Sequence, residues 1–180
     1  MDPPECSGHS HDHEHGDDLG LSLRQYIDFQ RVHCLNEEAL GSGKAILKLH
    51  EDRLSVEPSL LSPDGDPELL IIIPFTEAVT VQHFTIRSAG YNPDTAAPRH
   101  IKLFVDREDI DFEAARDMQA QQELDFLAPD HFPDGTIDYP CRPAGRFANI
   151  SCLSIFVANN YGDGAATEIT YIGLKGKGTR

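Results

Sequence analysis

Residues 64–76 read DGDPELLIIIPFT, an acidic turn that leads directly into the most apolar run of the chain. The five branched residues at 69–73 are far too few to span a membrane as a helix, which needs about 20. Three consecutive isoleucines favour a strand, because β-branched side chains pack well on a pleated surface. Since every position is apolar, we expect this strand to be buried on both faces in the middle of a sheet. Pro74 has no backbone N–H, so the strand should end or bulge there.

Other apolar segments also predict strands. Residues 147–159 form the second strongly apolar strand, with a nearly continuous apolar run at 153–157. A shift of phase in the apolar pattern of residues 79–87 predicts a β-bulge near His83. Shorter or one-sided strands are expected over residues 45–49, 54–56, 100–105 and 167–174.

The only plausible helix lies within residues 106–128, where Asp109 or Asp111 could act as the N-cap. Seven to nine short strands with loop breaks and one short peripheral helix are typical of an all-β protein built as an antiparallel β-sandwich. Strands and helices do not alternate regularly, which excludes a Rossmann-type domain. We expect the two apolar runs to be the centres of two packed layers that face each other.

The length of 180 residues suits one domain with tails. Residues 1–18 are rich in His and Asp and contain almost nothing to bury, so they predict a disordered tail. The folded domain should occupy residues 19–176, followed by a short tail at 177–180. In the first tail His9, His11, His13 and His15 alternate, and neutral imidazoles could bind a borderline divalent ion. A flexible solubilising tail is the favoured interpretation, because a defined metal site needs a preorganised shell.

The charge of the chain limits its partners. Thirty acidic residues against fifteen basic ones give a formal net charge of -15. This charge opposes binding to nucleic acid and to anionic membranes, and it steers the protein towards partners with basic patches. The four cysteines form no C-x-x-C pair, and the N-terminus has no apolar signal region. We therefore expect a cytoplasmic and possibly nuclear protein with reduced thiols, in which Cys34 and Cys152 are buried.

No catalytic constellation is visible in the sequence. Neither G-x-S-x-G nor H-E-x-x-H occurs, and the paired acids Asp64/Asp66 and Asp109/Asp111 lie in polar segments where solvent should leave them ordinary carboxylates. A catalytic dyad of Cys34 with a distant histidine stays an open possibility, although cysteines buried among apolar residues are usually inert. We therefore expect a protein that is not an enzyme and that needs no cofactor.

Several short motifs follow one another along the chain. They are Cys34-Leu35-Asn36-Glu37, Asp64-x-Asp66-x-Glu68-Leu69-Leu70, Ile73-Pro74-Phe75, Arg146-Phe147-x-Asn149, Leu153-Ser154-Ile155 and Tyr171-Ile172-Gly173-Leu174-Lys175-Gly176. Their order and spacing resemble the PITH domain, the proteasome-interacting module of thioredoxin-like proteins that also occurs alone. The resemblance covers about residues 21–176, and the histidine-rich opening also looks like that of stand-alone members.

The resemblance implies a jelly-roll sandwich similar to galactose-binding-like domains, without known catalysis. It also implies association with the regulatory particle of the 26S proteasome or another large assembly, and we expect the chain to act as a monomeric adaptor. Our hypothesis for the contact surface is Asn36 and Glu37 together with Asp64 and Asp66; the alternative is that these residues only cap strands. Two other functions stay open: binding of a small carbohydrate-like ligand, although the chain has no Trp, and metal handling through the histidine tail.

Overall fold

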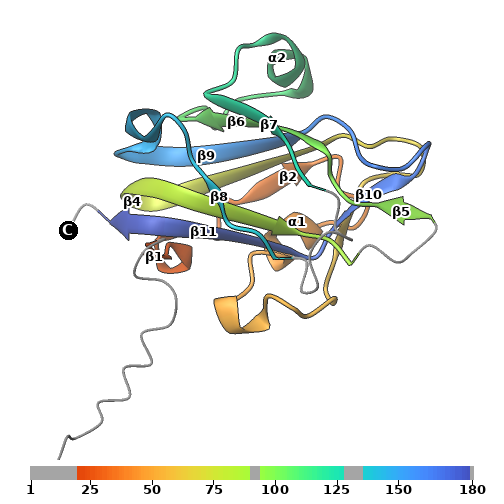
Figure 1. Cartoon of the computed structure of the whole chain (residues 1–180), viewed down its shortest axis with the longest axis horizontal. Helices are drawn as coiled ribbons and strands as arrows, with labels where there is room; N and C mark the ends of the chain where they lie inside the picture. Colours follow the sequence, from red (N-terminus) through yellow and green to blue (C-terminus); the bar gives the residue numbers. More distant parts are fainter. Residues whose placement is uncertain (1–19, 90–93, 128–135, 179–180) are drawn as a thin grey trace, which may run out of the picture.

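The computed structural model describes residues 20–89, 94–127 and 136–178. Within these ranges the strands form one curled eight-stranded sheet and one small three-stranded sheet (Figure 1). The large sheet has the order β1-β11-β4-β9-β6-β7, with β2 and β8 also paired to β4, and the small sheet has the order β3-β10-β5. The strands are β1 (Leu21–Ser22), β2 (His33–Leu35), β3 (Leu60–Leu61), β4 (Leu69–Arg87), β5 (Thr95–Ala96), β6 (His100–Val105), β7 (Gln122–Asp125), β8 (Tyr139–Pro140), β9 (Ile150–Val157), β10 (Ala166–Ile169) and β11 (Tyr171–Gly178).

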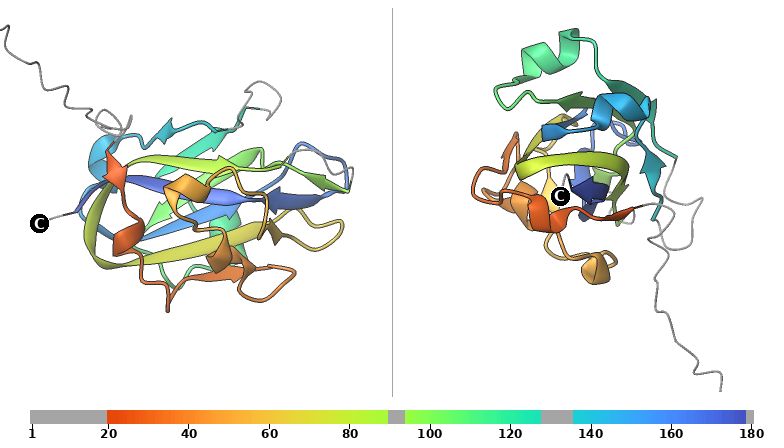
Figure 2. Two further views of the ribbon diagram at one scale, coloured as in Figure 1. Left: turned by 90° about the horizontal axis from the view of Figure 1, so that it is seen from below. Right: turned by 90° about the vertical axis from the view of Figure 1, so that its left-hand side faces the viewer.

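Strand β4 belongs to both layers of the sandwich. Its first part pairs with β2 and β9, and its second part pairs with β11 and β8. The register against β9 is regular up to Pro74 and resumes only at Val79, so the strand bulges after the proline as the sequence predicts. Figure 2 shows the strand running along one layer, curling at one end of the molecule and returning along the other.

The main core lies between these two layers. Ile71 on β4 is directly opposite Ile155 on β9, and both side chains are fully buried. The expectation that the two apolar runs face each other from opposed layers is therefore wrong, because they are neighbours in one layer. The opposite layer is supplied by the returning half of β4 and by β11, whose core residues are Val79, Val81, Phe84, Ile172 and Leu174.

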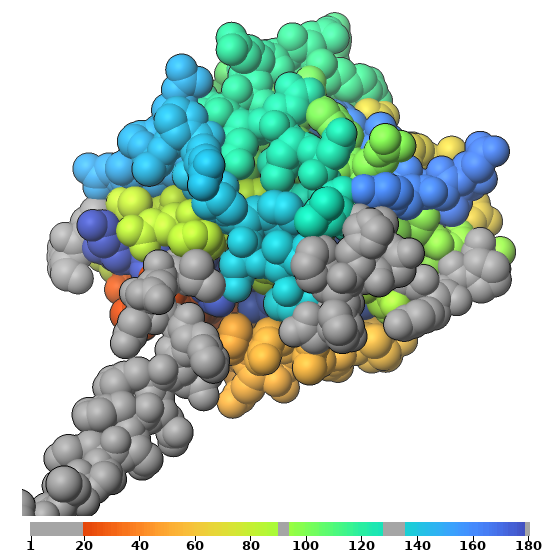
Figure 3. All heavy atoms as spheres, viewed as in Figure 1, coloured from red at the N-terminus to blue at the C-terminus, as the bar shows by residue number. Residues whose placement is uncertain are grey.

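A second core explains why the run in β4 is apolar at every position. Leu70 and Ile72 point away from the main core and pack with Phe104 and Phe156 on the outer face of the sheet. Helix α2 (Phe112–Asp117) and its flanking residues cover this face, so the predicted burial on both sides is confirmed. Figure 3 shows this segment as the top of the molecule. Asp111 is the N-cap of α2, as predicted, and its carboxylate accepts a hydrogen bond from the Ala114 N–H at 2.8 Å.

Several local predictions need correction. Residues 45–49 and 54–56 are not strands: Ile46 and Leu47 are buried, but they lie just after a short helix and belong to no strand. The helical elements there are α1 (Ser42–Ala45) and the 3₁₀ turn η2 (His50–Asp52), and further 3₁₀ turns are η1 (Arg24–Tyr26) and η4 (Ala144–Phe147). The described residues thus contain a second α-helix besides the predicted one.

The strand predicted over residues 167–174 is two strands in the structure. Thr170 separates β10 from β11, because β10 pairs in the small sheet and β11 pairs with β4. β11 continues to Gly178, two residues past the expected domain end. Opposite His83 the register of β11 shifts between Lys175 and Gly176, which confirms the predicted bulge. Among the described residues, no helix has the length and hydrophobicity needed to cross a membrane.

Candidate functional site

The structure brings Asn36 and Asp66 together at one corner of the sandwich. Because β2 pairs antiparallel with the start of β4, the residue after β2 lies beside the turn that precedes β4. The Asn36 side-chain amide donates to Asp66 Oδ2 at 2.9 Å and to the Glu68 carbonyl at 2.8 Å. Asn36 has a φ of 73°, a left-handed conformation that Asn adopts more readily than most residues. Its side chain therefore joins two chain segments and closes the end of β2.

The same corner is tied to helix α2. The other carboxylate oxygen of Asp66 accepts from the Glu68 N–H at 3.1 Å. Arg116 of α2 donates to both carboxylate oxygens of Glu68, at 2.8 and 2.6 Å. This paired geometry is the strongest form of an Arg–carboxylate contact, and here it fastens the helix to the turn. Asp64 differs from Asp66, because it is exposed and has no hydrogen bond or ion pair within the described part of the chain.

The carboxylate of Glu37 accepts hydrogen bonds from the backbone of its own loop. One of its carboxylate oxygens accepts from the Gly41 N–H and the other from the Gly43 N–H, both at 2.8 Å. Gly43 also packs against Cys34 so closely that a Cβ at this position would lie 2.4 Å from the Cys34 Cβ. The hydrogen bonds of Asn36, Glu37 and Asp66 are thus directed inward, which supports the interpretation that they cap strands and shape loops.

The loop at this corner also carries Leu40, which is not among the contact residues predicted from the sequence. It lies at the tip of the loop 36–43, and its side chain is 100% exposed. Glu38 and Ala39 beside it are also exposed. The signal was present in the sequence as a lone leucine between two glutamates and a Gly-Ser-Gly segment, but only the fold shows that Leu40 is not part of the core.

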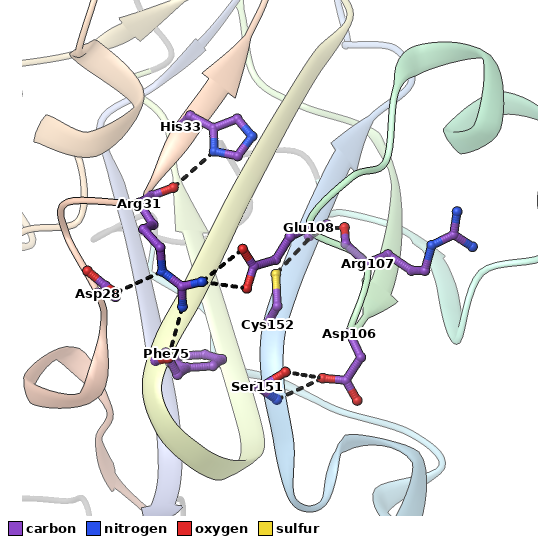
Figure 4. A network of polar contacts seen from close by, with 10 residues as sticks. Asp28, Arg31, His33, Phe75, Asp106, Arg107, Glu108, Ser151 and Cys152 are labelled. Carbon is purple, nitrogen blue, oxygen red and sulfur yellow. Dashed lines mark hydrogen bonds and ion pairs between the residues drawn. The ribbon is translucent and has the colours of Figure 1, made fainter.

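A second polar network lies on the outer face of the sheet (Figure 4). Arg31 donates to Asp28 Oδ2 at 2.8 Å and to both carboxylate oxygens of Glu108 at 3.0 Å. Next to it, Asp106 accepts hydrogen bonds from the Ser151 N–H and hydroxyl at 2.7 and 2.9 Å. Two carboxylates already neutralise the guanidinium, so this network holds the 28–31 and 106–108 turns together rather than offering a cation to an anionic ligand.

The described cysteines are poor nucleophiles. Cys34, Cys141 and Cys152 are free and buried. Burial raises the pKa of the Cys152 thiol to about 11 and that of Cys141 to about 12, and it also raises the pKa of Cys34. The prediction that Cys34 and Cys152 are buried is confirmed. Because the thiolate is the reactive form, these pKa values argue against a Cys34–histidine dyad.

His100 is held between two carboxylates at the β6–β7 edge. Its ring nitrogens lie 2.7 Å from Asp125 Oδ1 and 2.5 Å from Glu123 Oε1. Burial lowers the pKa of His100, but the hydrogen bonds to Asp125 and Glu123 outweigh it and the net pKa is raised. No group of three or more His, Cys, Asp or Glu side chains among the described residues could hold a metal ion. The candidate ligands His9, His11, His13 and His15 lie outside the described residues.

Buried polar atoms of the described residues are fully paired. Every buried side-chain nitrogen or oxygen in these ranges has a hydrogen-bond partner. Unpaired buried groups are a frequent mark of a site awaiting a ligand or ion. The buried polar groups of the described residues therefore serve the fold.

The fold places the chain in the class of galactose-binding-like β-sandwich domains. The solved F5/8 type C domain of a Bacteroides fragilis protein matches with a TM-score of 0.59 and 14% identity, over 89% of this chain and 98% of that domain. A family 32 CBM from Clostridium perfringens NanJ, solved in complex with galactose, matches with a TM-score of 0.54 and 8% identity, over 83% of this chain and 96% of that one. At such identities the likeness concerns the fold alone.

Sequence comparison identifies the family. The PITH domain model matches residues 13–180. A PITH domain-containing protein of Caenorhabditis elegans is 41% identical over 184 residues, covering 96% of this chain and 82% of the relative. One from Drosophila pseudoobscura is 34% identical over 182 residues, covering 94% and 82%. The chain belongs to the PITH domain family, which confirms the resemblance found in the motifs.

Proposed function

We propose that this protein is a non-catalytic adaptor that docks on the regulatory particle of the 26S proteasome. The observation that carries the proposal is the PITH family match over residues 13–180, because proteasome interaction is what the resemblance to this family implies. We further propose that the chain acts as a monomer in the cytoplasm and nucleus.

Two features of the molecule support an adaptor. The net charge of -15 favours encounter with basic protein surfaces. The cysteines of the described residues are buried, and the buried polar side-chain atoms of these residues are paired within the fold, which suits recognition by the outer surface rather than by internal side chains. A rigid sandwich of this kind suits a contact made by loops projecting from a fixed scaffold.

A binding measurement with purified components tests the proposal. The full chain is labelled and titrated with purified regulatory particle, and separately with purified core particle as the control. We expect saturable binding to the regulatory particle that weakens as salt is raised, because the chain is strongly acidic. Absence of saturable binding, or equal binding to both particles, would refute the proposal.

A second candidate function is recognition of a small carbohydrate-like ligand. The observation that favours it is the similar fold of a CBM solved with galactose. Fold likeness is a weak basis for function, and the chain contains no Trp on which a sugar ring could stack. Screening of the purified chain on a glycan array tests this candidate, and a reproducible hit that free sugar competes away would establish it.

Metal handling through the histidine tract is a third hypothesis from the sequence. Zinc titration of the full chain and of a chain lacking residues 1–18 tests it. Equal affinity in the two proteins would exclude the tract as the binding site.

A further inference from the structure

Leu40 stands out because the loop that carries it is fixed. A singly exposed leucine is common on protein surfaces and means little by itself. At the tip of the loop 36–43, however, the whole side chain is exposed while the backbone beneath it is held at several points.

Hydrogen bonds pin the loop at both ends and in the middle. Glu37 accepts from the Gly41 and Gly43 N–H groups. The Glu38 N–H donates to the Leu61 carbonyl at 2.9 Å, and the Ser42 hydroxyl donates to the Ala39 carbonyl at 2.7 Å. A loop fixed in this way loses little conformational freedom when a partner binds, which favours affinity.

The surroundings of Leu40 are acidic. Residues 36–43 contain two glutamates and no basic residue, and the side chain of Glu38 is exposed. The contact of Asn36 with Asp66 brings the acidic turn 64–66 to the same corner, with Asp64 exposed on it. The corner therefore presents one apolar side chain together with carboxylates.

We propose that the loop 36–43 is a docking element whose Leu40 inserts into an apolar pocket of a protein partner with Lys or Arg at the pocket rim. Glu38 contacts these basic groups, and Asp64 adds to their attraction. The inference rests on the proposed function and names the surface and the partner chemistry that this function would use.

Charge decides between this occupant and two others. A second copy of the chain would bring the same carboxylates together, and an anionic membrane would repel them. A basic-rimmed protein pocket satisfies both the leucine and the glutamates. Asn36 and Glu37 then act by positioning the loop, while Leu40 and Glu38 make the contact.

Three variants of the full chain, titrated with purified 26S regulatory particle at low and high salt, test the inference. Leu40→Asp should raise Kd at least tenfold. Glu38→Lys should raise Kd about three- to tenfold at low salt and weaken the salt dependence, because one attractive charge is reversed. Leu54→Asp is the matched control, since Leu54 is a 48% exposed leucine in another loop, and its Kd should stay within twofold of wild type.

The outcomes separate the two proposals. Binding by wild type with an unchanged Kd for Leu40→Asp, or an equal loss for Leu54→Asp, would overturn the docking loop and leave the proteasome proposal standing. Failure of wild type to bind would refute the proteasome proposal and this inference with it. Thermal unfolding of each variant shows whether it is folded, and Leu40→Ala, which adds no charge, provides a second measure of the contact with an expected rise in Kd of about fivefold or more.

Discussion

Asn36 donates a hydrogen bond to Asp66, thirty residues further along the chain, and joins the end of β2 to the turn before β4. Replacing Asn36 by Ala removes this bond and the bond to the Glu68 carbonyl. It also forces Ala into a left-handed conformation with a φ of 73°, which Ala adopts poorly. We expect Asn36→Ala to lower the free energy of unfolding by about 1–3 kcal/mol in urea denaturation. Asn36→Gly keeps the backbone conformation accessible and should be less destabilising; equal loss in both variants would show that the φ angle is unimportant.

Ile71 and Ile155, which are neighbours on the paired strands β4 and β9, predict a larger effect. Ile71→Ala and Ile155→Ala should each cost about 2–5 kcal/mol, because both side chains are fully buried and in the core between the layers. Their Cα atoms are register partners, so the double variant should depart from additivity by at least about 0.5 kcal/mol. Leu40→Ala is the control and should change stability by less than about 0.5 kcal/mol. Additive losses would contradict a shared packing site.

Local signals explain which parts of the fold could be predicted. The apolar run of β4, the bulge after Pro74 and the N-cap Asp111 depend on residues close together in sequence. The prediction of a strand at Ile46 and Leu47 is wrong, because burial gives the same apolar signal whether the backbone is a strand or the turn after a short helix.

The candidate site depended on contacts that sequence cannot supply. The pairing of β2 with β4 decides that Asn36 meets Asp66 and leaves Asp64 outward. The exposure of Leu40 likewise follows from the loop held by Glu37, not from the residue type. The structure therefore brings Asn36 and Asp66 together and leaves Asp64 exposed, while the role of this corner as a contact surface stays a prediction.

Gly176 of β11 lies where the register against β4 shifts, and the close approach of the two strands there predicts a strict requirement for glycine. A Cβ on Gly176 would lie 1.9 Å from the Thr80 carbonyl oxygen, a backbone atom that cannot move aside alone. Gly176→Ala should therefore lower the free energy of unfolding by about 1–3 kcal/mol. Gly145→Ala is the matched control, because a Cβ at Gly145 meets nothing within 4 Å. Similar stabilities of the two variants would show that β11 shifts without cost.

Because the described cysteines are buried, we expect their thiols to be modified slowly in the folded protein. In a Cys6→Ser background the remaining cysteines are the three buried ones, whose pKa values are all raised by burial. We expect a thiol reagent at pH 8 to label the folded variant at least about a hundredfold more slowly than the same variant in denaturant, since reaction requires opening of the core. A thiol that reacts fast in the folded state would contradict this burial and restore the possibility of a reactive cysteine.

The contacts of His100 with Asp125 and Glu123 should stabilise the β6–β7 edge more in mild acid than at alkaline pH. Its pKa in the folded state is raised, so its contribution to stability is fully present below the unfolded pKa of about 6.5 and is lost as pH rises through the folded pKa. His100→Gln should therefore be less stable than wild type at pH 5.5 by about 0.2–1 kcal/mol, a range appropriate because the partner carboxylates are half exposed or more. The difference should shrink by pH 8.5, and urea denaturation at the two pH values measures it. A gap between the proteins that widens with pH would mean that neutral His100, rather than the imidazolium, makes the stabilising contact with Glu123 and Asp125.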